Sequence, residues 1–534
     1  MTYLETIQSL TNDPEALELA YREAVKAGKE AAFAEAVEAA YTEEGDNLLL
    51  AAWHHRLAGA VSRPRGRTVA WSWTLLAGLL NGLLLWLLSD DQRFNIQIVN
   101  PLTHQRYTVM PAVALLAAPV SAALIALFLT VAGKRRWARV LAVVLGLGAA
   151  ATYVLLLVPG IWPRLYQEHY LTMMIVHLGL LSWAGVGLVA LARRGDQDRF
   201  AFLVKSLEAF VVAGLLAIAG GLFTAITTGL FQALSITLPT VVQRLFFAGG
   251  GGLIVVIAVA LVYDPRLEPA QQSFDEGLSK LITLLMRLLL PLTVAVLLVY
   301  LAFIPFNWRE PFENRDVLAV FNAMLFAVIA LLVGATPVHG AELSEKMQTW
   351  LRRGVIALAS LALLVSLYAL AAIIYRTASY RLSPNRLLLI GWNLVNIAVL
   401  VVLLIGQART GRQAWLRSMH RTFAIGAALY VTWSIAGLLA TPWIFRNQPA
   451  AVAGLPDSIL QVVYQRGEPI VLKCYGSPHI YLLQDGAKRW IRDIETFEAQ
   501  GYVWEDVLFT SCVELRRLPD GEPIPSDAWP VPQP

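Results

Sequence analysis

Long apolar stretches separated by short polar segments dominate the hydrophobic pattern of this chain. Each of eleven such stretches has about 20 residues, the length that a helix needs to cross about 30 Å of hydrocarbon. The pattern predicts an all-α polytopic transmembrane helical bundle of about eleven spans within residues 67–444. The predicted spans are residues 68–89, 111–133, 140–161, 171–192, 206–231, 245–263, 281–305, 317–338, 354–375, 386–406 and 421–443.

The first 66 residues are polar and rich in Ala and Glu, which predicts a cytoplasmic helical segment. Asp13 and Pro14 have the pattern of an N-cap and a first helical residue. Two more helices are expected, from about residue 29 to 43 and from Asp46 through Leu57. These amphipathic helices could pack on one another or lie on the membrane. No signal-peptide pattern is visible, so the first span is expected to act as a signal anchor.

The chain changes character after the last span. We expect a linker at 445–458, a small extracytoplasmic β-rich module at 459–518, and a Pro-rich, extended tail at 519–534. Asp-Gly at 485–486 lies between two apolar runs and predicts a β-hairpin. A short helix from Ile494 to Gln500 and a strand at Val513–Leu518 complete the predicted module.

The longest outer and inner loops of the membrane region have residue patterns that predict local structure. The longest outer loop, 89–110, carries Val, Ile and Tyr in a pattern that predicts a hairpin. The longest inner loops, 264–280 and 339–353, are amphipathic. The second of these suits a helix that lies at the membrane interface, with the polar residues Glu342, Glu345 and Lys346 and the apolar residues Leu343, Met347 and Leu351.

The distribution of Lys and Arg predicts the orientation. They are more than twice as frequent in the loops on one side of the spans as in the alternating loops. Cytoplasmic loops carry the excess, so the N-terminus is predicted to be cytoplasmic, and an odd number of spans places the C-terminus outside. The net charge of +4 is modest and spread over loops, so we expect no nucleic-acid partner.

The two cysteines of the chain, Cys474 and Cys512, both lie in the module predicted to be outside. A pair confined to an oxidising compartment is typical of a disulfide. Closing the loop between them would stabilise a small domain by roughly 4 kcal/mol. The alternative is two unrelated buried thiols.

A cluster of basic residues precedes the tenth span. Ser383 and Pro384 have the pattern of an N-cap and first residue, and a helix N-terminus attracts anions. The surrounding side chains could bind a phosphate or carboxylate such as a lipid headgroup, or could serve as interfacial anchors. The predicted ligand-binding residues are Arg376, Tyr380, Arg381, Ser383 and Arg386.

Several polar residues lie inside predicted spans. They could line a substrate path or form hydrogen bonds between helices. Asn322, Asn393 and Asn396 form the main set, and Asn81 and His177 are similarly placed.

Two further features have structural explanations. Lys205 and Glu208 are three residues apart and are expected to pair on one helical face. The glycine run at 249–252 lacks the Lys-Ser/Thr of a phosphate loop, so we interpret it as a site of close helix packing or a flexible break.

No catalytic motif, metal-ligand set or cofactor-binding motif is evident. One enzyme hypothesis concerns Asp90 and Asp91, which directly follow the first span. Polytopic glycosyltransferases that use lipid-linked sugars have a similar layout, in which an outer carboxylate acts as a base or binds a metal.

The segment Tyr380-Arg381-Leu382-Ser383-Pro384-Asn385-Arg386 resembles the element that opens a late span in the bacterial polytopic family called domain of unknown function 4153. The start of the fifth span at Lys205 and Glu208 and the Phe306-Asn307 loop are also similar. Arg381 and Ser383 replace the Gly and Thr of that family. The resemblance covers about residues 200–410 and implies a topology but no chemistry. Separately, residues 481–507 resemble a small module of bacterial cell-surface proteins.

Three functional hypotheses follow. The first is an integral protein of the bacterial cytoplasmic membrane, embedded in the lipid bilayer, that acts as an envelope scaffold or sensor with an extracytoplasmic binding domain. The second is a transporter or lipid-handling protein with an anion site on its outer face. The third is a lipid-linked-sugar glycosyltransferase that uses Asp90 and Asp91.

Overall fold

The computed structural model describes most of the chain as two compact units, Met1–Val69 and Ala70–Pro534. The described residues are 3–26, 30–43, 47–61, 69–99, 106–161, 164–191, 195–274, 276–313, 315–339, 343–380, 382–411, 414–446, 455–484 and 486–534.

The first unit is a small helical domain with its own core. It consists of α1 (Tyr3–Ser9), α2 (Pro14–Lys26), α3 (Glu30–Glu43) and α4 (Leu48–Val61). The predicted N-cap of α2 is confirmed, because Asp13 Oδ1 accepts hydrogen bonds from two backbone N–H groups of the first turn. Phe33 and Trp53 are among the buried residues of a core to which all four helices contribute. The helices therefore pack on one another, and α1 is an element that the sequence did not predict.

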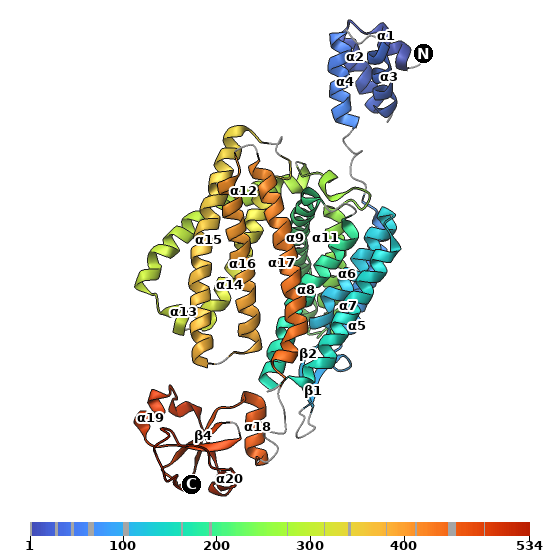
Figure 1. The fold of residues 1–534 in the computed structure, drawn as a ribbon. Coiled ribbons are helices and arrows are strands. Elements are labelled where there is room, and N and C mark those ends of the chain that lie inside the picture. Colours follow the sequence, from blue (N-terminus) through green and yellow to red (C-terminus); the bar gives the residue numbers. More distant parts are fainter. Residues whose placement is uncertain are drawn as a thin grey trace. The chain divides into compact units, whose positions relative to one another are not determined.

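The second unit is built from long apolar helices (Figure 1). Their bounds are α5 (Trp71–Leu88), α6 (Ala112–Gly133), α7 (Trp137–Leu157), α8 (Arg164–Ala190), α9 (Asp196–Ala233), α11 (Gly250–Val262), α12 (Gly277–Phe303), α14 (Arg315–Ala335), α15 (Glu345–Tyr380), α16 (Pro384–Arg409) and α17 (Trp415–Ile444). The short helix α10 (Thr240–Arg244) and a π-helical turn (Leu245–Gly249) lead directly into α11. A further short helix, α13 (Glu310–Glu313), precedes α14.

Within the described residues, 10 helical segments are long and apolar enough to cross a membrane. They coincide with ten of the predicted spans. The remaining prediction, 317–338, falls on α14, whose apolar part is the shorter segment Val320–Ala335. Leu325 and Leu332 of this segment are fully buried in the largest core, so α14 is an integral part of the bundle.

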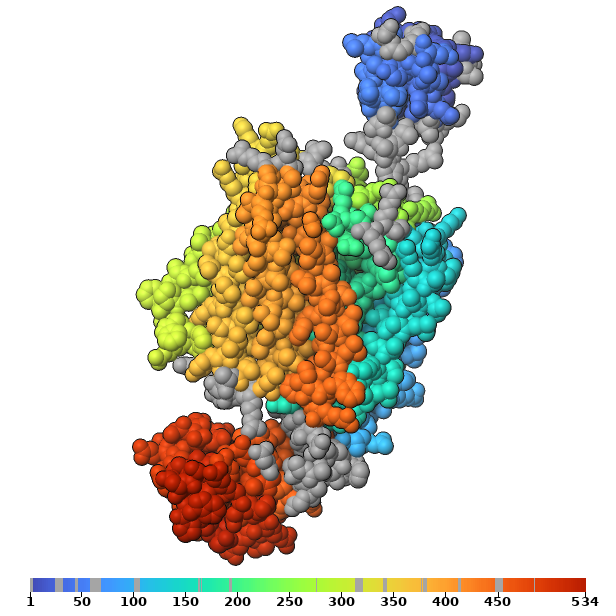
Figure 2. All heavy atoms as spheres, in the orientation of Figure 1, coloured from blue at the N-terminus to red at the C-terminus, as the bar shows by residue number. Residues whose placement is uncertain are grey.

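The bundle is apolar outside as well as inside. α15, α16 and α17 lie side by side in sequence order, and Figure 2 shows their side chains forming a continuous wall. Elsewhere large apolar side chains point outward, such as Phe210 (76% exposed) and Ile218 (73%) on α9 and Leu288 (69%) on α12. A helix that is hydrophobic on all sides suits a lipid environment.

Of the loop predictions, the hairpin is confirmed, and the second amphipathic segment does not form a helix of its own. Strands β1 (Asn95–Val99) and β2 (Arg106–Pro111) pair antiparallel within the 89–110 loop. The segment from Glu345 to Leu351 is the beginning of α15, which continues without a break to Tyr380. Leu351 is fully buried, so this segment packs into the bundle as the first part of α15 and does not lie flat on its surface.

The C-terminal module is a mixed α/β domain. Its sheet has the order β5-β4-β3-β6, formed by β3 (Ile470–Cys474), β4 (Ile480–Gln484), β5 (Ala487–Ile491) and β6 (Val507–Thr510). β6 runs parallel to β3 and the other pairs are antiparallel. Helices α18 (Asp457–Arg466), α19 (Ile494–Ala499) and α20 (Cys512–Arg517) accompany the sheet.

Most predictions for the module are confirmed. The β4–β5 hairpin and the helix near Ile494 form as expected, and Cys474 and Cys512 form a disulfide with Cα atoms 4.9 Å apart. The tail contains no helix and lies along β5, where Asp520 and Ile524 form isolated bridges.

The predicted strand at Val513–Leu518 is wrong, because this segment is helix α20. Ser511 caps the helix by accepting a hydrogen bond from the N–H of Glu514 at 3.1 Å. Leu515 and Leu518 are buried three residues apart whereas Val513 is exposed, which is the spacing of a helix. The Ser-x-x-Glu pattern was the available signal for this helix.

The glycine run allows α5 and α11 to approach each other closely. A Cβ at Gly252 would lie 2.9 Å from Cα of Gly82, and one at Gly82 would lie 2.6 Å from the carbonyl oxygen of Gly249. This approach of α5 to α11 lets Asn81 Nδ2 donate to the carbonyl of Gly252 at 2.9 Å and to Ser121 Oγ at 3.0 Å. Close packing, one of the two interpretations of the glycine run, is therefore confirmed.

Replacing Gly252 with Ala is expected to lower the free energy of unfolding by about 1–3 kcal/mol, because the methyl group would overlap the α5 backbone. The matched control is Gly251→Ala, where a Cβ meets no atom within 4 Å. A gain in helix propensity should leave that variant as stable as the wild type or more so. Thermal unfolding, monitored by gel filtration, measures the stability of both variants. Equal stability of Gly252→Ala and Gly251→Ala would contradict the close approach of α5 and α11.

Candidate functional site

The start of α16 has the predicted N-cap. Ser383 Oγ accepts a hydrogen bond from the N–H of Arg386 at 3.5 Å, and Pro384 is the first helical residue. Arg386 is half-buried and lies at this helix start. The side chains of Arg376 and Tyr380, and the whole of Arg381, lie outside the described residues. The anion site therefore stays a prediction.

The three asparagines come together in the interior. Asn393 Nδ2 on α16 donates to Asn322 Oδ1 on α14 at 3.4 Å, and the hydroxyl of Tyr430 on α17 donates to Asn396 Oδ1. Asn393 and Asn396 are fully buried. The rings of Trp392 and Tyr430 stack beside them with centroids 5.5 Å apart. These contacts join three helices and support the packing interpretation.

Some buried polar atoms near this cluster have no hydrogen-bond partner. They are Asn393 Oδ1, Asn396 Nδ2, Trp433 Nε1 and Nε2 of His177, whose ring lies 5.2 Å from that of Trp392. A buried polar atom without a partner is costly, and it can bond to a water molecule or a polar ligand. The cluster thus contains hydrogen bonds that hold helices together and also polar atoms that can bond to a water molecule or a ligand.

Asp90 has structural contacts at the end of α5. Its Oδ2 lies 3.4 Å from Nη1 of Arg244 and 3.9 Å from Nε of Arg93, and its Oδ1 accepts from the N–H of Gln92. These contacts link α5 to α10. In the part of the chain that the structure describes, no three His, Cys, Asp or Glu side chains group as a metal site.

The predicted pairing of Lys205 and Glu208 is confirmed, and both side chains are buried. Lys205 Nζ lies 2.8 Å from Glu208 Oε2. The ammonium also donates to Ser279 Oγ at 3.0 Å and to the carbonyl of Ser273, and Ser279 Oγ donates to Glu208 Oε2 at 2.7 Å. Sequence reasoning missed these serines because they are about seventy residues away along the chain. The two charges thus neutralise each other, and Glu208 Oε1 is the one carboxylate oxygen of the pair that is buried without a hydrogen-bond partner.

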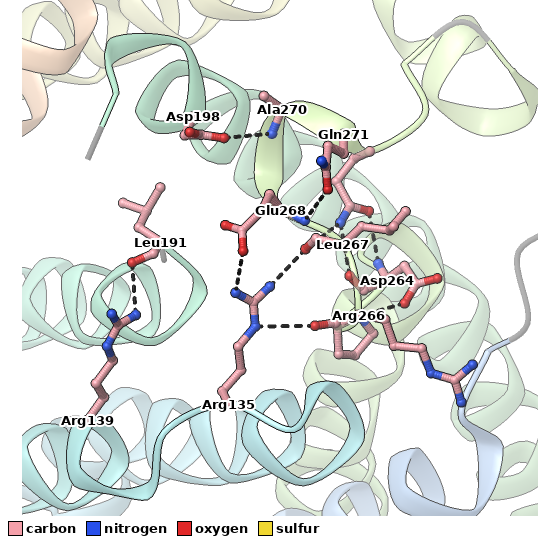
Figure 3. Close-up of polar contacts among 12 residues, drawn as sticks. Arg135, Arg139, Leu191, Asp198, Asp264, Arg266, Leu267, Glu268, Ala270 and Gln271 are labelled. Atoms are coloured by element: carbon pink, nitrogen blue, oxygen red, sulfur yellow. Dashed lines mark hydrogen bonds and ion pairs between the residues drawn. The ribbon is translucent and has the colours of Figure 1, made fainter. Parts of the chain in front are cut away.

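Figure 3 shows how Arg135 holds the loop between α11 and α12. Its guanidinium donates to the carbonyls of Pro265 at 3.3 Å and Leu267 at 2.8 Å. It also pairs with the Glu268 carboxylate at 3.1 Å. Asp198 on α9 accepts from a backbone N–H of the same loop at 3.2 Å. The loop is therefore tied to the α6–α7 connection and to α9.

The module docks on the N-terminal end of α8. Tyr464 of α18 is almost fully buried, and its hydroxyl donates to Gln167 Oε1 at 3.5 Å. The ring of Tyr107 on β2 lies 6.3 Å from the Tyr464 ring, and the Arg164 guanidinium lies 4.1 Å from the centroid of Tyr107. Burial raises the pKa of Tyr464 to about 12, so this hydroxyl is a neutral donor at physiological pH. No local pattern of residues indicates this contact.

The module also exposes a stacked pair of aromatic rings beside its disulfide. Tyr475 is 73% exposed and Phe509 51% exposed, and their centroids are 5.1 Å apart with an interplanar angle of 22°. Tyr475 directly follows Cys474, and Phe509 lies on β6 close to Cys512. The disulfide therefore ties together the two segments that carry the rings. Exposed aromatic rings are typical of binding surfaces.

No family model, curated protein or solved structure matches this chain. The resemblance to the domain of unknown function 4153 family therefore stays a prediction.

Glu208→Gln is expected to lower the free energy of unfolding by about 3–5 kcal/mol, because it leaves the Lys205 ammonium buried without its counter-charge. The double variant Lys205→Met, Glu208→Leu removes both charges and is expected to recover most of the loss. Thermal unfolding of the purified protein measures the effect. A Glu208→Gln variant as stable as the wild type would show that the network is not needed as an ion pair.

Proposed function

We propose that this protein is a multi-pass protein of the bacterial cytoplasmic membrane that acts as an envelope scaffold or sensor. Its helical bundle anchors the C-terminal module and holds it on the outer side. The observation that carries this proposal is the docking of α18 on α8, where Tyr464 is buried against Gln167. A module docked in this way is presented in a fixed position and can transmit a load or a signal to the bundle.

The proposed orientation has two supports. The excess of Lys and Arg in alternate loops favours a cytoplasmic N-terminus, and with α14 counted as an eleventh crossing the C-terminus lies outside. The disulfide between Cys474 and Cys512 suits the oxidising side of the membrane.

The binding surface of the module is proposed to be the stacked pair Tyr475 and Phe509. Two large, exposed rings on a small, disulfide-bonded domain offer an apolar face that can stack on flat partners such as the sugar rings of an envelope polymer. The disulfide, with its Cα atoms 4.9 Å apart, links the end of β3 to the start of α20.

Intact cells that are first reduced and then treated with a membrane-impermeant maleimide are expected to label the module, because its two cysteines are the only ones in the chain. A control variant carries Cys474→Ser, Cys512→Ser and Ser344→Cys, which places its one thiol in a proposed cytoplasmic loop. That variant should be labelled only after lysis. Wild-type labelling that also requires lysis would overturn the outward placement.

Full-length protein in detergent is expected to co-sediment with purified cell-wall sacculi through the aromatic pair. The double variant Tyr475→Ser, Phe509→Ser should weaken this binding at least about tenfold, because aromatic residues at interface centres carry much of the binding free energy. Trp504→Ser is the control, since Trp504 is an exposed ring elsewhere in the module. Equal sedimentation of all three proteins, or no sedimentation of the wild type, would count against this binding surface.

A further inference from the structure

A cavity of about 250 Å³, partly open to the surface of the bundle, lies between α6, α8, α9 and α11. Its walls are almost entirely apolar, with Ile125, Leu129, Val186, Val255 and Val259 among the lining residues. For comparison, an engineered apolar cavity of about 150 Å³ stays dry and binds benzene. The cavity is therefore large enough for an alkyl or prenyl segment but too small for a two-chain phospholipid.

The charged group on the cavity wall has no capacity left for a ligand. An ammonium has three N–H donors, and those of Lys205 are used by Glu208, Ser279 and the carbonyl of Ser273. An anionic headgroup would find no donor there and would lie next to the Glu208 carboxylate. The electrostatics thus favour a neutral ligand.

The hydroxyl of Ser206 is also occupied. It donates to the carbonyl of Phe202 at 2.7 Å and accepts from Trp183 Nε1 at 2.9 Å.

Ser182 differs from these groups. It lines the cavity, its side chain is only 3% exposed, and its Oγ has no hydrogen-bond partner. A buried hydroxyl without a partner is costly and marks a place where a ligand atom can bond. Because a hydroxyl both donates and accepts, it complements another hydroxyl.

Gly179 lies three residues before Ser182 on the same face of α8, and it also lines the cavity. A Cβ at Gly179 would meet no atom within 4 Å, so the glycine leaves space that no other side chain fills. The chain thus maintains an empty volume directly beside the unpartnered hydroxyl.

From these observations we propose that the cavity binds a neutral, single-chain lipid alcohol. Its apolar chain lies along the walls from α6, α9 and α11, and its hydroxyl bonds to Ser182 Oγ on α8. This site is independent of the module and goes beyond its proposed presentation, so either proposal can fail without the other.

The test uses full-length protein in detergent and a decanol probe that carries a diazirine and an alkyne. We expect saturable photolabelling of peptides from the four helices that line the cavity. Decanol should compete best with the probe, decane less well, and decanoate at alkaline pH least. Gly179→Leu should reduce labelling more than about tenfold, because its side chain fills the cavity while improving helix propensity. Gly146→Leu on α7 is the matched control, since a Cβ there also meets no atom within 4 Å but lies outside the cavity.

Ser182→Ala keeps the cavity open and removes only the hydroxyl. It is expected to reduce the preference for decanol over decane by about fivefold, the value of one hydrogen bond. Labelling that is unaffected by Gly179→Leu, or that is not saturable, would overturn the site and indicate lipid on the outer surface of the bundle. Decanoate competing as well as decanol, or an unchanged preference in Ser182→Ala, would overturn the assignment of the ligand class.

Discussion

Ten of the described helices are long and apolar enough to cross a membrane, and hydrocarbon cannot form hydrogen bonds. In such an environment each backbone polar group must find its partner inside its own helix, which is the arrangement that long apolar helices provide. Polar side chains that remain inside the bundle must then find one another. Lys205 meets Glu208 and Ser279, and Asn393 meets Asn322. The few internal polar groups thus act as specific links between helices whose apolar surfaces are otherwise nonspecific.

Small residues determine where two segments come close enough for such polar contacts to form. Gly82 and Gly252 bring α5 and α11 so close that a side-chain amide on one helix reaches a backbone carbonyl on the other. Gly133 has the same effect at the end of α6, because a Cβ there would lie 2.2 Å from the Pro265 carbonyl oxygen. Arg135 then holds that loop through the neighbouring carbonyls. In both places the absence of a side chain is what permits the polar contact.

Local patterns in the sequence predicted the local structure. The apolar runs predicted the long helices, and Asp13, Ser383 and the Asp-Gly turn predicted two helix starts and a hairpin. Contacts between distant segments left no such signal. The Lys205 network depends on Ser273 and Ser279, and the docking of α18 pairs Tyr464 with Gln167, 297 residues earlier. The strand predicted at Val513 failed because the cap at Ser511 outweighed the β propensity of Val513.

Helix α8 carries residues of three places described in the second unit. Its N-terminal end carries Gln167, which contacts the module, its middle carries His177 beside the asparagine cluster, and Ser182 lies on the cavity wall. Gln167 and Ser182 are separated by about 22 Å at 1.5 Å per residue. No proline interrupts the helix between them, so a displacement at either end moves the other. If a lipid alcohol and an envelope polymer each favoured one position of α8, thermodynamic linkage would make each ligand change the affinity of the other by the same factor.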